Sequence, residues 1–489
     1  MGIGGLLSGE LSVGSFISLL PIFSLGIFLA LTLALVDRKR RYPEKSWLNN
    51  AVNLLLSPAR ALKVGPYKNG ALTLQNALKY AVHKSKLSDF GGMEFADAYE
   101  AIASTLTQQR QRYTNLGYIS GRIELNMTMV RRLKFVEYLR QVPAVSKVPV
   151  PSPVFVMGLP RTGTTLLHRL LSLDTKRCRA PLLWELLATV PKPTSSDPEE
   201  HAKDRESRAK FIRRLIATRK RMGDRALEHI HEIGSDNPEE CFFALSDSVP
   251  CLSQYLYSMY MHPETAMPVM KQHMTGAYLW YRKYLQLLSF QTGEVGGGVR
   301  TWMLKCPAHL FYTGEIAMAF PDAKLIWTHR HPISAVPSMC SLLKSIHQMY
   351  FENECRDDHA LGRSMLKVSE DLLAQAPVDI ATSKLPCADV VYDNLVADPV
   401  GTVQKIYLQF GWEYTAEYDA KLRAHVDEDK RQRDALKAKK VKEGVAKSSE
   451  VLHTYSPEEF GMTAQELSSG KYADYISKYS TPLPKAGAH

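Results

Sequence analysis

A glycine-bearing turn between a short apolar run and a helical segment constrains the fold of this chain more than any other feature. The apolar run covers residues 154–157, the turn reads GLPRTGTT over residues 158–165, and the segment LLHRLL follows. A wholly apolar run of this length is typical of a strand that is buried on both faces of a parallel sheet. A strand, a glycine turn and a helix in this order direct backbone N–H groups and a helix N-terminus at one point, which is a geometry that binds phosphate. The sequence therefore predicts an anion site at residues 158–165.

The turn differs from the loop that binds ATP and GTP, whose pattern is GxxxxGK[ST]. Both glycines fit that pattern, but Thr164 occupies the position of its lysine. That lysine normally reaches the β- and γ-phosphates, so a triphosphate with its metal ion is poorly served here. Arg161 instead supplies a forked cation inside the turn, which suits an oxyanion at the 5′ end of a shorter nucleotide. The predicted contacts to this anion are Arg161, Thr162, Gly163, Thr164 and Thr165.

Similar apolar runs recur further along the chain and alternate with helical stretches. They lie at Thr301–Leu304, Leu325–Thr328 and Val390–Tyr392. Strands that alternate with helices indicate an α/β fold, in which a parallel sheet is flanked by helices. We expect this α/β domain to cover residues 151–480 and to follow a helical region at residues 47–150, where apolar residues recur at helical spacing.

The turn and its flank, GLPRTGTTLL, resemble the 5′-phosphosulfate-binding loop of sulfotransferases that use 3′-phosphoadenosine 5′-phosphosulfate (PAPS). The loop is most similar to the PRSGTT branch, which includes tyrosylprotein sulfotransferases and many bacterial and algal ones. A second element agrees with this resemblance, because LIWTHRHP at residues 325–332 places Arg330 after a strand, and Ser338 follows eight residues later. In the family, an arginine and a serine at this spacing bind the 3′-phosphate of PAPS. The resemblance extends over Val154–Tyr479 and implies a P-loop-type α/β fold with PAPS as co-substrate.

The resemblance also implies a cation and a base for sulfonate transfer. Lys305 follows an apolar run, and in the family a lysine at the end of a comparable strand contacts the bridging oxygen of the donor. Glu185 lies 24 residues after Arg161, a separation similar to that of the glutamate base in tyrosylprotein-type enzymes, and its apolar neighbours could desolvate it and make it more basic. His309 is the rival base, because cytosolic sulfotransferases keep a histidine soon after their lysine. Here it comes two places later than in their KTH arrangement, so Glu185, His309 and neither of the two stay open.

Other polar clusters do not indicate a metal site. The Pro238-Glu239-Glu240 segment follows two histidines closely, but their spacing fits no standard set of metal ligands, and a wall of the substrate pocket or a helix-capping turn is favoured. The seven cysteines show no CxxC spacing, so no metal is expected. The Arg-Lys-Gly tripeptide with which cytosolic members complete the 3′-phosphate site is absent. Another segment must therefore close the nucleotide site, and the tail His453–Gly461 is a candidate.

An uncharged apolar run near the N-terminus, Phe16–Val36, predicts a transmembrane helix. About 21 residues at a rise of 1.5 Å each span about 30 Å, the thickness of a bilayer core. The basic cluster Arg38–Arg41 then predicts, by the positive-inside rule, a cytosolic location for the remaining chain, with a luminal domain as the alternative. Residues 1–46 are therefore expected to form a single-pass membrane anchor and its flank. The apolar residues of the next stretch, Trp47–Leu62, could lie on the membrane surface or pack on the main domain.

The combined prediction is a membrane-anchored sulfotransferase that moves the sulfonate of PAPS to a hydroxyl of a lipid, sterol, carbohydrate or protein. The formal net charge of +11 predicts attraction to anions in general, and the mixed charges of residues 426–447 give no reason to expect a nucleic-acid-binding arm. Two alternatives come from other classes. A P-loop nucleotide kinase is opposed by Thr164 and by the Arg330 and Ser338 pair, whereas a catalytically idle membrane adaptor would still bind the nucleotide.

Overall fold

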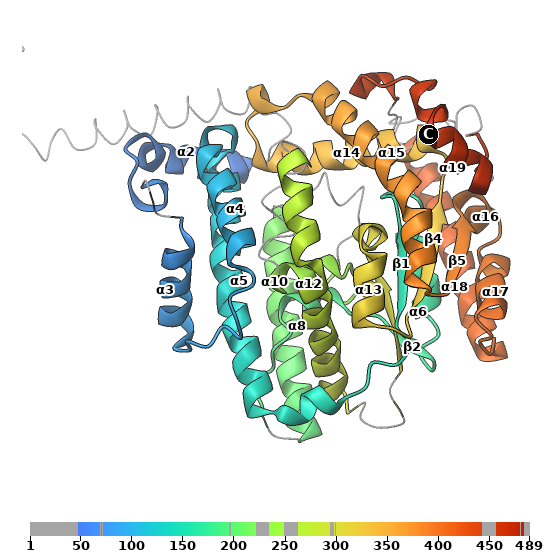
Figure 1. The fold of residues 1–489 in the computed structure, drawn as a ribbon, viewed down its shortest axis with the longest axis horizontal. Coiled ribbons are helices and arrows are strands. Elements are labelled where there is room, and N and C mark those ends of the chain that lie inside the picture. Colours follow the sequence, from blue (N-terminus) through green and yellow to red (C-terminus); the bar gives the residue numbers. More distant parts are fainter. Residues whose placement is uncertain are drawn as a thin grey trace, which may run out of the picture.

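A five-stranded parallel sheet flanked by helices forms the centre of the molecule (Figure 1). The computed structural model describes residues 47–68, 70, 72–194, 197–221, 234–248, 263–293, 298, 300–442, 456–479 and 481–483. The predicted α/β fold with a parallel sheet is confirmed. The predicted transmembrane run Phe16–Val36 and its basic flank lie outside the described residues. Among the helices that are described, none has the length and hydropathy needed to cross a bilayer.

The strands confirm the predicted runs and add one. They are β1 (Val154–Gly158), β2 (Cys178–Arg179), β3 (Thr301–Lys305), β4 (Lys324–His329) and β5 (Cys387–Val391), in the spatial order β2-β3-β1-β4-β5. The two-residue strand β2 carries no apolar run and was not predicted. The last strand begins three residues before the predicted one and ends at Val391, because Tyr392, which was predicted as strand, is the first residue of α16 (Tyr392–Ala397). Its first residues were not predicted because the exposed Asp389, between the buried Ala388 and Val390, interrupts the apolar run.

Each face of the sheet has its own hydrophobic core, because successive side chains of a strand point to opposite faces. Phe155, Trp302 and Trp327 belong to the larger core, which also includes the helices that precede the sheet in sequence. Val156, Met303 and Ile326 belong to the smaller core on the other face, which is formed with α6, α17 and α18. The helices therefore cover the sheet on both sides, as Figure 1 shows.

The helices divide by their place in the chain. Those before β1 are α2 (Trp47–Ala61), α3 (Leu74–Ser85), α4 (Ala96–Gln108) and α5 (Asn115–Gln141). Those between β1 and β3 are α6 (Thr164–Ser172), α7 (Leu183–Leu187), α8 (Pro198–Arg221), α10 (Phe242–Ser248) and α12 (Pro263–Gln291). Those that follow are α13 (Thr313–Ala319), α14 (Pro332–Tyr350), α15 (Asp358–Ser383), α16 (Tyr392–Ala397), α17 (Pro399–Gln409), α18 (Ala416–Lys442) and α19 (Lys471–Tyr479).

Two helices that matter for the site begin where their sequence signals predict. Gly163 adopts a left-handed conformation at the N-cap of α6, so the chain can turn sharply out of β1 and into the helix. Pro332 is the first residue of α14, a position where its missing N–H costs no hydrogen bond. Both helices therefore start at the carboxyl ends of neighbouring strands, β1 and β4.

Candidate active site

The turn after β1 is held in a fixed shape by its own backbone and by β4. Gly158 has a φ of +151°, and a Cβ atom on it would lie 2.6 Å from the carbonyl oxygen of Thr328. The hydroxyl of Thr162 donates to the carbonyl oxygen of Leu159 at 2.6 Å and lies 2.6 Å from the hydroxyl oxygen of Thr328. Arg161 has a φ of +71°, which is uncommon for a residue other than glycine. The buried hydroxyl of Thr162 therefore stabilises the turn itself. The predicted contact of Thr162 with an anion would come from its backbone N–H group.

We expect the Gly158→Ala variant to lose nucleotide binding. The added methyl group would overlap the backbone of β4, so the turn would have to move, at a cost of about 1–3 kcal/mol. Gly411→Ala is a matched control, because Gly411 is also left-handed, at φ +64°, and a Cβ atom on it would have no other atom within 4 Å. Thermal melts with and without 3′,5′-bisphosphoadenosine measure both effects. A Gly158→Ala variant that keeps the nucleotide-induced shift would contradict the importance of this close approach.

The second predicted anion contact lies beside the first. Because β1 and β4 are neighbours in the sheet, the turn after β1 and Arg330 after β4 meet at one edge. The Arg330 guanidinium donates to the backbone carbonyl oxygen of Arg161 at 3.0 Å and lies 4.4 Å from the ring centre of Tyr392. The Arg161 guanidinium in turn donates to the hydroxyl of Ser338 at 3.2 Å. Arg161, Arg330 and Ser338 are therefore in one place, as a single nucleotide bound by all three would require.

The N-terminus of α6 completes this edge. Thr164 and Thr165 are the first two residues of the helix, and no side chain caps it at Gly163. The first backbone N–H groups of a helix lack partners within the helix, and they attract anions. The helix start and the two arginines together give a positively charged site for an oxyanion.

Lys305 lies at the end of β3, one strand away from β1. Its side chain is buried, and its amine donates to a carboxylate oxygen of Glu240 at 2.8 Å. Burial alone would lower the pKa of Lys305, but the carboxylates of Glu240 and Glu239 more than offset this and raise the pKa above its usual value. The lysine therefore stays charged at neutral pH, as a group that balances negative charge must.

Glu240 is a candidate site residue that the sequence placed in a pocket wall or a capping turn, and not among the candidate bases. Its segment is fastened at both ends, because Glu239 N–H donates to the carbonyl oxygen of Pro181 at 3.0 Å and Cys241 N–H donates to that of Lys305 at 2.9 Å. Its side chain is 25% exposed, whereas that of Lys305 is fully buried. Glu240 is thus the more accessible member of the pair. The Pro238-Glu239-Glu240 motif was the available signal, but only the fold brings it to Lys305.

Glu185, the first predicted base, is committed to other contacts. One oxygen of its carboxylate accepts a hydrogen bond from the guanidinium of Arg179 at 2.5 Å, and the other accepts from the backbone N–H of Leu182 at 2.9 Å. Both side chains of the ion pair are buried, and Arg179 also lies 4.4 Å from the ring centre of Trp302. Both carboxylate oxygens of Glu185 therefore already accept hydrogen bonds from within the protein. The role of Glu185 as the base stays a prediction.

His309, the rival base, lies in the hydrophobic core. It belongs to a short 3₁₀ helix, Pro307–Phe311, its Nδ1 atom is 2.6 Å from the hydroxyl oxygen of Tyr278, and its ring stands edge-on to Phe155. Burial, and secondarily the charge of Lys305, lowers the pKa of His309 to about 3. An imidazole with so low a pKa takes up a proton poorly at neutral pH. Its catalytic role also stays a prediction.

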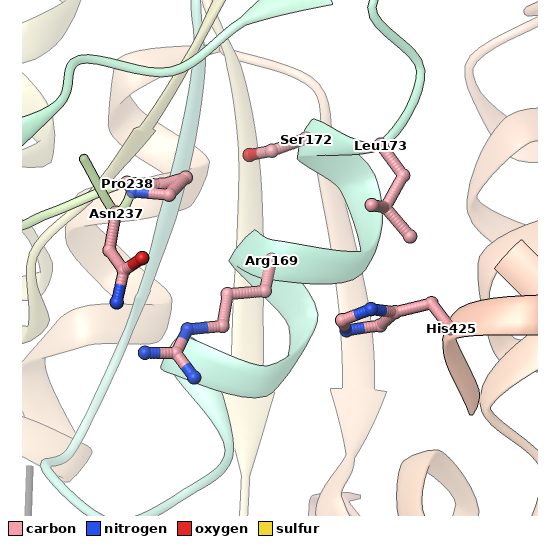
Figure 2. Close-up of a pocket in the computed structure, with 6 residues that line it drawn as sticks. All are labelled: Arg169, Ser172, Leu173, Asn237, Pro238 and His425. Carbon is pink, nitrogen blue, oxygen red and sulfur yellow. The ribbon is translucent and has the colours of Figure 1, made fainter. Parts of the chain in front are cut away.

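An open hollow of about 250 Å³ lies on the outer side of α6 (Figure 2). Its lining residues are Arg169, Ser172, Leu173, Asn237, Pro238 and His425. None of the predicted site residues lines it, although Pro238 is only two residues from Glu240. The hollow therefore flanks the segment that carries Glu240 and is distinct from the edge where the two arginines meet.

The C-terminal helix α19 packs beside Arg330. The hydroxyl of Tyr475 lies 3.1 Å from Nδ1 of His329, and the ring of Tyr479 stacks on the same imidazole with ring centres 3.9 Å apart. Nε2 of His329 is 2.9 Å from a carboxylate oxygen of Asp389. A tail segment was predicted to close the nucleotide site. The segment that reaches the residue before Arg330 is α19, whereas part of the predicted tail, residues 453–455, lies outside the described residues.

Among the residues that the structure describes, no group of histidine, cysteine, aspartate and glutamate side chains could hold a metal ion. The parallel sheet, the turn after β1 and the helix that follows it define an α/β protein whose sheet is flanked by helices, and whose glycine turn carries Thr164 at the lysine position of the ATP-binding pattern. A family model described as "Sulfotransferase family" matches residues 153–416, more than half of the 489 residues. The chain belongs to the sulfotransferase family.

Comparisons with individual proteins agree with this assignment. The omega-hydroxy-beta-dihydromenaquinone-9 sulfotransferase Stf3 of Mycobacterium bovis is 25% identical over 281 residues, which cover 53% of this chain and 62% of that protein. The chain thus matches less than two thirds of this relative. The crystal structure of sulfotransferase STF1 from Mycobacterium tuberculosis H37Rv is similar in fold, with a TM-score of 0.64, 24% identity, and coverage of 82% of this chain and 98% of that one. Sulfotransferase STF9 from Mycobacterium avium has a TM-score of 0.67, 22% identity, and coverage of 85% and 98%.

Proposed function

We propose that this protein transfers the sulfonate group of PAPS to the hydroxyl group of an apolar acceptor. One observation carries the proposal: Arg161, from the turn after β1, is hydrogen-bonded to both Arg330 and Ser338, which come from a separate sequence element, at one edge of the sheet. One nucleotide with charged groups at both its 5′ and 3′ positions would engage both elements. A nucleotide that carries phosphate only at its 5′ end would leave Arg330 and Ser338 unused.

The donor would bind with its 5′-phosphosulfate at the turn and its 3′-phosphate at Arg330 and Ser338. The backbone N–H groups at the start of α6 and the Arg161 guanidinium would hold the first group, and the Arg330 guanidinium would fork the second. The contact of the Arg161 guanidinium with the Ser338 hydroxyl, and that of the Arg330 guanidinium with the Arg161 carbonyl oxygen, hold both cations at one edge of the sheet. The site is thus arranged for anions before they arrive.

Sulfonate transfer then needs a base and a stabilised leaving group. The acceptor hydroxyl gives its proton to a carboxylate, its oxygen forms the new bond to sulfur, and the bond from sulfur to the 5′-phosphate oxygen breaks. The leaving product, 3′,5′-bisphosphoadenosine, keeps that electron pair, and the charged Lys305 would balance the added negative charge. We assign the base role to Glu240, because it is the partly exposed carboxylate that touches Lys305, with Glu185 and His309 as the competing predictions.

The acceptor class is supported by sequence similarity and by the N-terminal run. The name of the Mycobacterium bovis relative describes a menaquinone derivative as its acceptor, which is a lipid with a hydroxyl group. The run Phe16–Val36 would hold the protein at a bilayer, where such molecules reside, and the basic cluster after it would keep the α/β domain on the cytosolic side. A luminal domain would instead depend on transport of PAPS across the membrane.

A thermal melt separates this proposal from the kinase alternative. We expect 3′,5′-bisphosphoadenosine at about 100 times its Kd to stabilise the protein by about 2.7 kcal/mol, which corresponds to several degrees in Tm. ATP with magnesium should shift Tm less, because Thr164 stands where a triphosphate site needs lysine. The reverse order would favour a nucleotide kinase. A shift with the bisphosphate but no transfer of sulfur-35 from PAPS to any of a panel of lipid, sterol, sugar and peptide alcohols would favour the catalytically idle adaptor.

A further inference from the structure

Helix α2 is turned so that its polar side faces the protein and its apolar side faces outward. The buried residues of this helix are all asparagines, namely Asn49, Asn50 and Asn53. The outward side carries Trp47, Leu55 and, in the turn that follows the helix, Leu62, which are 67%, 69% and 72% exposed. Val64 continues this surface and is 50% exposed. Trp47, Leu55, Leu62 and Val64 together form the α2 apolar face.

The inward side of α2 is fixed by specific hydrogen bonds. The side-chain oxygen of Asn53 accepts from the backbone N–H of Leu116 at 2.8 Å, and the side-chain amide of Asn115 donates to the carbonyl oxygen of Asn53 at 2.7 Å. Arg60 donates to the carbonyl oxygen of Tyr113 at 2.8 Å. These bonds join α2 to the start of α5, where an apolar side of α2 would leave polar groups unsatisfied. The outward direction of the apolar side therefore follows from the packing of the polar side.

We propose that the α2 apolar face lies in the surface layer of a lipid bilayer. An amphipathic helix with tryptophan and leucine on one side and basic residues beside it binds in the plane of a membrane interface. Here the exposed residues Lys63 and Lys68 follow the helix and are placed to meet lipid headgroups. The helix has 15 residues and is about 22 Å long, which is too short to cross a bilayer core but suited to lie along its surface.

The position of α2 in the chain selects a bilayer over a second protein as the occupant. Ten residues separate the end of the apolar run at Val36 from Trp47. Ten residues can span at most about 36 Å, so a run that enters a bilayer keeps α2 close to the same surface. The segment between them includes the basic cluster Arg38–Arg41, which favours a surface with anionic lipids. This inference does not depend on the proposed sulfonate transfer, because it concerns another part of the molecule.

Tryptophan fluorescence of the full-length protein tests this inference, because Trp47 is the one tryptophan among six whose side chain is mostly exposed. The protein is reconstituted in vesicles of phosphatidylcholine and phosphatidylserine, with either ordinary or chain-brominated phosphatidylcholine. We expect the brominated lipid to quench part of the emission and the Trp47→Phe variant to lose most of that quenching. The same quenching in the Trp47→Phe variant as in the original protein would overturn the proposal.

A second pair of variants separates contact by the helix from mere closeness of the anchor. In the Leu55→Glu/Leu62→Glu variant we expect at least a twofold loss of bromine quenching, because two charged side chains would not stay in the acyl region of the bilayer. Tm and the bisphosphate-induced Tm shift should not change. Leu408→Glu is the matched control, since Leu408 lies on α17 and is 82% exposed. It should leave the quenching unchanged. Full quenching in the double variant would overturn the proposal. So would protection of Trp47 from aqueous iodide that depends on protein concentration and not on lipid, because it would show that a second copy of the chain covers the α2 apolar face.

Discussion

The Glu240→Gln variant is expected to bind the nucleotide normally and to turn over about 10²–10⁴ times more slowly than the original protein. Glutamine keeps an oxygen that can accept the hydrogen bond from Lys305, which is 2.8 Å from Glu240, but an amide cannot take a proton from the acceptor hydroxyl. The bisphosphate-induced Tm shift measures binding, and transfer of sulfur-35 from PAPS to a long-chain alcohol measures turnover.

Glu185→Gln is the matched variant for this experiment, because it makes the same change in the first predicted base. Here we expect a lower Tm, as in Glu240→Gln, because a buried cation (Arg179 or Lys305) would lose the negative charge of its carboxylate partner, and breaking a buried ion pair costs about 3–5 kcal/mol. Turnover per folded molecule should change little. If Glu185→Gln abolished turnover while Glu240→Gln did not, the base role would belong to Glu185. Normal turnover in both variants would exclude both glutamates as the base and leave His309 as the remaining predicted base.

The Arg330→Ala variant is expected to bind 3′,5′-bisphosphoadenosine about 10- to 150-fold more weakly. A charge-assisted contact contributes about 1.5–3 kcal/mol, and each 1.4 kcal/mol is a factor of ten in Kd. Adenosine 5′-monophosphate serves as a matched ligand, because it lacks the 3′-phosphate that Arg330 is proposed to bind. Its Kd should change much less, as measured by calorimetry.

An equal loss of affinity for both ligands would give a different explanation. Arg330 also donates to the carbonyl oxygen of Arg161, so its removal could act by loosening the turn after β1. The Ser338→Ala variant helps to distinguish the two cases, because the Ser338 hydroxyl accepts from the Arg161 side chain, whereas Arg330 donates to the Arg161 backbone. It should weaken binding of the bisphosphate selectively and by less than Arg330→Ala does.

The sheet, and the meeting of the glycine turn with Arg330 at one edge of it, could be predicted from the sequence because their signals are local. Four apolar runs marked strands, and a glycine turn and an arginine marked the ends of two of them. Parallel strands point their carboxyl ends the same way, so residues that follow them come to one edge. The short strand β2 and the full length of β5 were missed, because one has two residues and the other alternates buried and exposed positions.

The contacts of the candidate bases could not be predicted, because they join residues that are distant in the chain. Glu240 reaches Lys305 across 65 residues, and the spacing of Pro238-Glu239-Glu240 holds no information about that meeting. Glu185 is only six residues from its partner Arg179, but β2 and the turn after it decide that the two side chains converge. Similarly, the spacing of apolar residues in Trp47–Leu62 was visible in the sequence, whereas the outward direction of that side depends on the contact of Asn53 with Leu116.

Helix α19 has a consequence for the order in which the protein matures. Tyr475 and Tyr479 complete the packing around His329, the neighbour of Arg330, although they come about 150 residues later in the chain. During synthesis on the ribosome, the edge of β4 therefore lacks this wall until α19 has emerged from the exit tunnel. A nascent chain, or one clipped by a protease before Lys471, would keep the glycine turn and yet lack the finished surroundings of the second arginine.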